Sequence, residues 1–465
     1  MKKSILVSVL LFALPILSIA QMQLWGMTGG GGVYSDGTIF ACTPSNFAIN
    51  TVVSFDGTNG GRPCSSLMQA PDGYIYGTTQ AGGASGNGNI FKCSPSGALT
   101  SIASFNGRNG SAPSGDLVYA TDGNLYGMTT NGGAYDSGEI FQCTPSGVIN
   151  VLVNFNGING LYPYGSLIQG IDGDLYGMAM YGGGAGDSGT IFKCTTTGVL
   201  TILYKFNCSS GGYPYNSLIQ ASDGNLYGMT LYGGTADSGV IFKCTPSGDY
   251  TTLVSLNAQT GCFPYGNLVQ GADGNLYGMT QAGGAYSGGT LFKCTTSGMI
   301  NVVVNFNDTI GQSPMGSLIL ASDSNLYGMT TAGGVSGAGF VFQYTPTGKL
   351  TNLARLTGAL YACSPVRQYG KLLEVNPTLG LSEINSADRT LVYPVPAHST
   401  LYLLFDSPIT GNVKVIDVSG RELMAVGALD KKKTKTIDVS TLSPGIYFVV
   451  VESSTNKSVY KFVKE

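Results

Sequence analysis

Histidine and charged residues are scarce in this chain of 465 residues. The single histidine is His398, close to the C-terminal end, so the long region before it holds no Ser-His-Asp or Cys-His nucleophile system and no histidine-ligated metal site. Charged residues make up 11% of the chain, and the pI is about 5.3. This balance gives no reason to expect binding to nucleic acid or to an anionic membrane.

Long apolar runs are also missing, with one exception at the N-terminus. Two lysines precede an apolar run from Ile5 to Ile19, which ends in a small-x-small cleavage pattern before Gln21. The run is short for a membrane span, and no other segment resembles one. We therefore predict that residues 1–20 are a secretory signal peptide, that the protein has no transmembrane segment, and that it reaches an oxidising compartment.

Glycine is abundant, with 70 residues, and it recurs in a repeated pattern. The segment DGNLYGMT that begins at Asp122 returns about every fifty residues. Related segments begin at Leu24, Asp72, Asp172, Asp223, Asp273 and Asp323. Each repeat holds four short strand-like segments and tight Asp-Gly or Thr-Gly turns, without helical periodicity. One antiparallel sheet per repeat predicts an all-β fold, a seven-bladed β-propeller with four-stranded blades.

The two ends of the repeat array suggest how the ring closes. The first repeat lacks its first strand and begins at Leu24, whereas a strand-like segment, residues 370–375, follows the seventh repeat. We expect this C-terminal strand to complete blade 1, because joining the ends in one sheet removes an exposed edge. The predicted propeller spans residues 21–375, where 11 basic and 17 acidic residues give a net charge of −6.

The repeated units also resemble a known family. Over residues 24–350, the Leu-Tyr-Gly-Met-Thr-x-x-Gly-Gly units are similar to GloVer (Gloeo-Verruco) tandem repeats, which occur in secreted bacterial proteins. This resemblance implies a propeller-like repeat protein. The family brings no settled activity, so function has to be sought in the residues themselves.

Residues 392–465 resemble the C-terminal sorting domain of the type IX secretion system, after a polar segment, 376–391, predicted to be a linker. The motifs that carry the resemblance are Tyr393-Pro394-Val395-Pro396, 413–421, 437–447 and 461–465, with Val395 where the family usually has Asn. The resemblance implies a Bacteroidetes-type bacterium and recognition of this domain by the type IX machinery. It also implies a secreted protein, extracellular or attached to the outer-membrane surface. Alternating polar and apolar segments suggest an Ig-like β-sandwich.

Two acidic residues break the repeat and are the candidates for catalysis. Asp116 replaces a Ser or Asn, and Glu139 replaces a Thr, at the same end of the first and third strands of one blade. Strands two places apart are separated by roughly 9–10 Å, a distance that an inverting glycosidase uses. The alternative is that both are ordinary polar residues of the surface.

The recurring aspartates are interpreted as structural. The Asp-Gly aspartates suit two-residue turns, and a second set in the glycine-rich loops suits loop capping. The second set consists of Asp36, Asp136, Asp187 and Asp237. Its spacing matches no EF-hand loop, so we predict no metal site and no cofactor.

The ten cysteines divide into two groups. Six occupy one repeat position and are expected to pack as small apolar side chains. They are Cys42, Cys93, Cys143, Cys194, Cys244 and Cys294. The other four lie in blade-crossing segments, and we predict the disulfides Cys208–Cys262 and Cys64–Cys363, the second of which would fasten the closing blade.

The remaining candidate is a surface on the side of the long loops. Tyrosines gather there around blades 4 to 6, and the predicted ligand-binding residues are Tyr164, Tyr181, Tyr215, Tyr232 and Tyr265. Aromatic rings on an uncharged surface suit neutral sugars or a protein partner, unless they only pack between blades. We expect a monomeric, non-catalytic binding or adhesion module. The alternatives are a carbohydrate-active enzyme, either hydrolase or lyase, and a purely structural surface or matrix protein.

Overall fold

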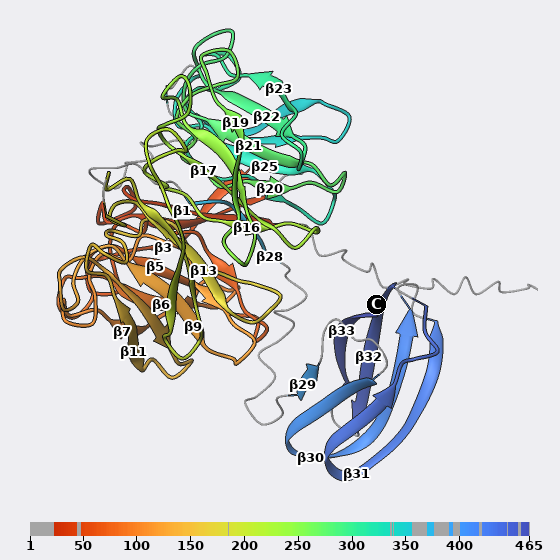
Figure 1. The fold of residues 1–465 in the computed structure, drawn as a ribbon. Helices are drawn as coiled ribbons and strands as arrows, with labels where there is room; N and C mark the ends of the chain where they lie inside the picture. The colour runs from red at the N-terminus through yellow and green to blue at the C-terminus, as the bar shows by residue number, and fades with distance from the viewer. Residues whose placement is uncertain are drawn as a thin grey trace, which may run out of the picture. The chain divides into compact units, whose positions relative to one another are not determined.

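Figure 1 shows a computed structural model of the chain. It describes residues 23–43, 48–184, 186–334, 337, 339–355, 370–375, 390–393, 400–417, 421–443, 445–453 and 457–464. The predicted signal peptide, His398 and Cys363 lie outside the described residues. Over the part that is described, the chain contains strands and no helix, and therefore no helix able to cross a membrane. The chain divides into two compact units, Met1–Gly380 and Leu381–Glu465.

Six sheets of the first unit are each built from four consecutive antiparallel strands. The first strands are β4 (Met68–Gln69), β8 (Val118–Tyr119), β12 (Ile168–Gln169), β16 (Ile219–Gln220), β20 (Val269–Gln270) and β24 (Ile319–Leu320). The second strands are β5 (Ile75–Thr79), β9 (Leu125–Thr129), β13 (Leu175–Ala179), β17 (Leu226–Thr230), β21 (Leu276–Thr280) and β25 (Leu326–Met329). The third strands are β6 (Asn89–Cys93), β10 (Glu139–Cys143), β14 (Thr190–Cys194), β18 (Val240–Cys244), β22 (Thr290–Cys294) and β26 (Phe340–Tyr344). The fourth strands are β7 (Leu99–Ser104), β11 (Ile149–Asn154), β15 (Leu200–Lys205), β19 (Tyr250–Ser255), β23 (Ile300–Asn305) and β27 (Leu350–Arg355).

A seventh four-stranded sheet joins the two ends of the unit. Its strands run in the order β28 (Leu373–Val375), β1 (Gln23–Thr28), β2 (Thr38–Thr43) and β3 (Ala48–Ser54). Strand β28 pairs with β1 through Gln23 opposite Val375 and Trp25 opposite Leu373. The C-terminal strand thus closes the first sheet, and the prediction of an all-β protein of repeated four-stranded blades is confirmed.

Apolar side chains join each sheet to its neighbour in sequence, and the last sheet also packs against the first. At the closure, Tyr327 and Met329 of β25 pack with Leu24 and Phe40 of the first sheet. We number the sheets as blades 1 to 7 from the sheet that contains β1.

The repeated Leu-Tyr-Gly unit is explained by packing inside each blade. In β9, Gly127 lies opposite Phe141 of β10, and a Cβ on Gly127 would come within 2.6 Å of the phenyl ring. Any larger residue would displace a fully buried ring. The glycine therefore allows a phenylalanine to fill the space between neighbouring blades.

The second unit contains one five-stranded sheet. Its strands are β29 (Thr390–Tyr393), β30 (Thr400–Asp417), β31 (Glu422–Asp438), β32 (Gly445–Ser453) and β33 (Lys457–Lys464). Strands β31 and β32 both pair with β30. The pairing confirms a β-structured C-terminal unit, whereas its Ig-like sandwich form stays a prediction.

Candidate functional site

The candidate site lies where the chain crosses from one blade to the next. In three successive crossings a bulky residue directly before proline has a positive φ: 48° at Tyr162, 57° at Tyr213 and 58° at Phe263. Such a conformation costs about 1–3 kcal/mol for a bulky side chain, so the surrounding structure has to hold it. The backbone N–H of Tyr213 donates to the carbonyl of Ser188 in the preceding blade, over 2.8 Å. Each crossing is thus fixed by the loop of the blade that it leaves.

This geometry places aromatic rings in a continuous row over blades 4 to 6. Tyr181 contacts Tyr162 at a centroid distance of 6.2 Å and Tyr213 at 5.3 Å. Tyr213 then contacts Tyr232 at 5.7 Å, and Tyr232 contacts Phe263 at 5.5 Å. All four contacts are edge-on or tilted, with interplanar angles of 60–90°. We call these five residues the outer aromatic row.

A second set of tyrosines lies beneath, in the same crossings. Tyr164 stacks on Tyr215 at 5.0 Å, and Tyr215 meets Tyr265 edge-on at 5.6 Å. Tyr215 is only 1% exposed, so it cannot contact a ligand and instead supports its neighbours. This corrects its predicted role, because the stacked rings fill the space between adjacent blades. Tyr164, Tyr181 and Tyr265 are half-buried, and Tyr232 is 39% exposed.

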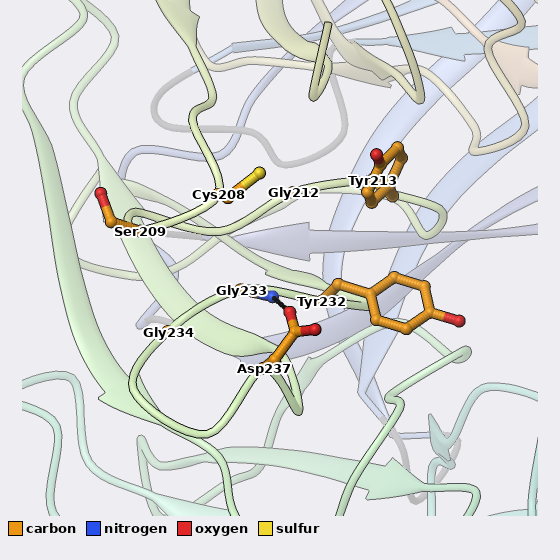
Figure 2. Close-up of a pocket in the computed structure, with 8 residues that line it drawn as sticks. All are labelled: Cys208, Ser209, Gly212, Tyr213, Tyr232, Gly233, Gly234 and Asp237. Atoms are coloured by element: carbon orange, nitrogen blue, oxygen red, sulfur yellow. Dashed lines mark hydrogen bonds between the residues drawn. The ribbon is translucent and has the colours of Figure 1, made fainter. Parts of the chain in front are cut away.

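A pocket of about 570 Å³ opens beside the outer aromatic row. One wall is the crossing into blade 5, and the other is the glycine-rich loop of that blade. Its lining residues are Cys208, Ser209, Gly212, Tyr213, Tyr232, Gly233, Gly234 and Asp237. Figure 2 shows the rings of Tyr213 and Tyr232 toward one end and Cys208 and Ser209 toward the other.

Among the described residues that line the pocket, Asp237 is the only charged one. One of its carboxylate oxygens, Oδ1, accepts a hydrogen bond from the backbone of Gly233 over 2.8 Å, which caps the loop as its position predicted. A carboxylate beside an exposed aromatic ring can accept hydrogen bonds from the hydroxyl groups of a ligand, while the ring covers an apolar face of the same ligand. Among the described residues, no group of three histidine, cysteine or acidic side chains could hold a metal ion.

The structure places Asp116, one of the two catalytic candidates, in a chain of hydrogen bonds between the first segments of successive blades. The side chains that accept these bonds belong to short polar residues at one repeat position, and each bond comes from a backbone N–H. The bonds run from Lys371 N to Ser66 Oγ (2.8 Å), Ser66 N to Asp116 Oδ1 (2.6 Å), Asp116 N to Ser166 Oγ (2.8 Å), Ser166 N to Ser217 Oγ (2.7 Å), Ser217 N to Asn267 Oδ1 (2.8 Å) and Asn267 N to Ser317 Oγ (2.8 Å). The second oxygen of Asp116, Oδ2, pairs with Lys371 Nζ at 3.3 Å. Asp116 thus links blades 1, 2 and 3.

The other catalytic candidate, Glu139, is fully buried at the start of β10. Within the described part of the chain neither carboxylate oxygen has a hydrogen-bond partner, and burial raises the pKa of Glu139 to about 7. No described contact joins Glu139 to Asp116, so the predicted carboxylate pair stays a prediction.

The cysteines agree only in part with the predicted disulfides. Cys208 and Cys262 are both free thiols, which corrects the first pairing. The Sγ of Cys208 lies 3.6 Å from Ser188 Oγ in blade 4, whereas the backbone of Cys262 pairs with Ala282 in blade 6. The two cysteines occupy different positions of their crossings, Cys208 directly after Asn207 and Cys262 directly after Gly261. Cys64 is disulfide-bonded, but its predicted partner lies outside the described residues, so that pairing stays a prediction.

Comparison with protein families matches nearly the whole chain. Residues 16–188 and 166–379 match the Gloeobacter/Verrucomicrobia repeat, and residues 391–465 match the secretion system C-terminal sorting domain. The sorting domain indicates export by the type IX machinery of a Bacteroidetes-like bacterium to the cell surface or the medium. A search of the curated proteins found no match.

Two solved structures illustrate the fold. The first is a proposed 6-phosphogluconolactonase from Bacteroides fragilis NCTC 9343, with 16% identity and a TM-score of 0.53 over 78% of this chain and 100% of that one. The second is a quinoprotein alcohol dehydrogenase-like protein from Bacteroides thetaiotaomicron VPI-5482, with 14% identity and a TM-score of 0.52 over 77% of this chain and 78% of that one. At such low identity the likeness concerns the fold alone. On the family matches, the chain belongs to the Gloeobacter/Verrucomicrobia repeat family and ends in a type IX sorting domain.

Proposed function

We propose that this protein is a non-catalytic binding module of the cell surface or medium, and that it binds a neutral glycan at the pocket of blade 5. The observation that carries the proposal is the outer aromatic row, in which Tyr213 and the exposed ring of Tyr232 both line that pocket. Sugars combine an apolar ring face with many hydroxyl groups. An exposed tyrosine beside one carboxylate and several backbone groups suits that combination.

Preorganisation supports the same conclusion. Tyr213 and Phe263 are held at positive φ by backbone hydrogen bonds from their N–H groups to Ser188 and Ser238 of the preceding blades. Tyr213 also packs with Tyr215, Met180 and other members of the same apolar cluster. Rings fixed before binding lose little conformational freedom when a ligand arrives, which favours affinity.

The surroundings of the two acidic candidates do not favour the enzymatic alternative. Asp116 accepts a backbone hydrogen bond and pairs with Lys371, and its side chain is only 11% exposed. Glu139 is 0% exposed. A general acid or base must reach the proton that it transfers, and neither carboxylate has that access in this conformation.

A glycan array probed with the full chain tests the proposal. We expect binding to one class of neutral oligosaccharide and loss of the signal in Tyr232→Ala. Tyr286→Ala removes a ring of the glycine-rich loop of blade 6 that is 63% exposed and does not line the pocket, and should bind like the wild type. Saccharide turnover would instead favour the enzyme, and absence of both binding and turnover would favour a structural protein.

A further inference from the structure

Position 139 carries an acid that no other blade has. Its counterparts at the start of the third strand are all uncharged: Thr38, Asn89, Thr190, Val240, Thr290 and Phe340. Like Glu139, they are buried. An ionised carboxylate at such a position is costly unless a proton, a hydrogen bond or a cation compensates its charge.

Two counterparts show what this space normally contains. In blade 2, Asn89 Nδ2 donates to the carbonyl oxygen of Asn59 over 2.9 Å, and in blade 6, Thr290 Oγ1 donates to that of Thr260 over the same distance. Both carbonyls belong to the residue directly before a crossing glycine, which is Gly60 in the first case and Gly261 in the second. The corresponding residue of blade 3 is Asn109. An ionised Glu139 has no proton to donate, so it cannot make the hydrogen bond that Asn89 and Thr290 make to this carbonyl.

The neighbouring groups add oxygen atoms and no positive charge. Thr129 Oγ1 is buried without a partner, like both oxygens of Glu139. A Cβ on Gly110 would lie 2.6 Å from Thr129 Oγ1 and 2.8 Å from Glu139 Oε2, so these oxygens line one space. On the other side, a Cβ on Gly133 would lie 2.7 Å from both Glu139 Oε1 and Asn154 Oδ1.

No described cation compensates Glu139. The crossing that holds Gly110 carries Arg108, and the glycine-rich loop that holds Gly133 carries Asp136, and both side chains are exposed. The described ion pairs include none with Glu139. One buried carboxylate, one hydroxyl and one amide oxygen are the kinds of ligand that hard metal cations prefer.

We propose that blade 3 holds a hard metal cation, Na⁺ or Ca²⁺, between Glu139, Thr129 and the oxygens of the adjoining loops. The cation would fasten the crossing at Gly110 and the loop at Gly133 to the start of β10. The site is separate from the pocket of blade 5 and does not depend on a glycan.

Thermal unfolding of the chelator-treated full chain at pH 8 tests the proposal, with choline chloride as the cation-free reference. Addition of NaCl or CaCl2 should raise the midpoint by about 3 °C when the site is saturated, and KCl and MgCl2 serve as the comparison. Which of the two salts acts identifies the cation. An equal midpoint in all salts would overturn the proposal.

Three variants locate the effect. Glu139→Gln should lose the rise in midpoint with added cation while remaining folded in choline chloride. Its amide can donate to the carbonyl oxygen of Asn109, as Asn89 donates to that of Asn59 in blade 2. Thr129→Val should raise the half-saturating cation concentration by about fivefold. Asp136→Asn, an exposed acid of the same loop, should respond like the wild type. A Glu139→Gln protein that still responds fully would place the cation elsewhere and refute the assignment.

Discussion

Single residues explain why the sequence repeats as it does. In six blades the aspartate of the Asp-Gly or Asp-Ser turn accepts a hydrogen bond from the tyrosine hydroxyl four residues later, at 2.6–3.0 Å. Burial alone would raise the pKa of Asp122, but the hydrogen bonds from Tyr126 and Asn124 outweigh it and lower the pKa. The turn role was predictable from the Asp-Gly pair. The bond to tyrosine was not, because it depends on side-chain direction across the turn.

Tyr126→Phe should lower the free energy of unfolding by about 1–2 kcal/mol, because the hydroxyl donates to an ionised carboxylate and its ring is fully buried. Urea denaturation monitored by fluorescence measures the change. Tyr135→Phe is the matched control, since that ring is 62% exposed, and it should leave stability unchanged. Equal stability of both variants would show that the Asp122–Tyr126 bond contributes nothing.

Glu139 predicts a pH dependence of stability in cation-free solution. Burial raises its pKa from 4.5 to about 7, so the folded state favours the protonated form. Its contribution is fully present below about pH 4.5 and is lost as the pH rises through about 7, by up to about 3 kcal/mol. Wild type and Glu139→Gln should therefore diverge between pH 5 and 8 when their unfolding midpoints are compared. Parallel profiles would contradict the raised pKa.

Among the elements, the short strand β28 joins the C-terminal end of the first unit to its N-terminal strand. It completes the first sheet. Just before it, Lys371 donates its backbone N–H to Ser66 of blade 2 and pairs through its ammonium group with Asp116 of blade 3. Within it, Glu374 accepts a hydrogen bond from the backbone of Ser322 in blade 7 over 2.8 Å. The closing strand was predictable because the first repeat lacks one. The hydrogen bonds between blades were not, although a short polar side chain at the positions of Ser66 and Asp116 is their visible signal.

Removal of β28 should destabilise the first unit strongly. A chain that ends at Tyr369 loses Leu372 and Val375, which are 0% and 1% exposed. The burial of these two side chains contributes about 3–6 kcal/mol to the free energy of unfolding. A chain that ends at Gly380 keeps the strand. Circular dichroism melting should show a clear fall in the midpoint for the shorter chain only, and similar midpoints would argue against closure by β28.

The crossings explain why one predicted disulfide was wrong. Sequence spacing placed Cys208 and Cys262 in successive crossings, but Cys208 lies against Ser188 of blade 4, whereas the backbone of Cys262 pairs with Ala282 of blade 6. We predict that Cys208, which is exposed, reacts with iodoacetamide in the non-reduced protein and that no Cys208–Cys262 peptide forms. Mass mapping that finds this cross-linked peptide would contradict the structure.

For the whole molecule, the residues that repeat in every blade build the fold, and the residues that differ between blades form the candidate sites. The fifty-residue repeat, its strand-like segments and its tight glycine turns predicted the all-β fold, because each has a local physical cause. Of the proposed binding surface, the gathering of tyrosines on blades 4 to 6 was predictable. The pocket was not, because its walls at Cys208 and Asp237 come from two loops whose approach depends on the crossing backbone.

We propose that the pocket of blade 5 binds a glycan through Tyr232. The most direct test is calorimetric titration of the oligosaccharide selected on the array into wild type, Tyr232→Ala and Tyr286→Ala. We expect Tyr232→Ala to raise the dissociation constant about tenfold or more, equivalent to ~1.4 kcal/mol, and Tyr286→Ala to match the wild type. Equal affinity of Tyr232→Ala and wild type, or no measurable binding by the wild type, would contradict it.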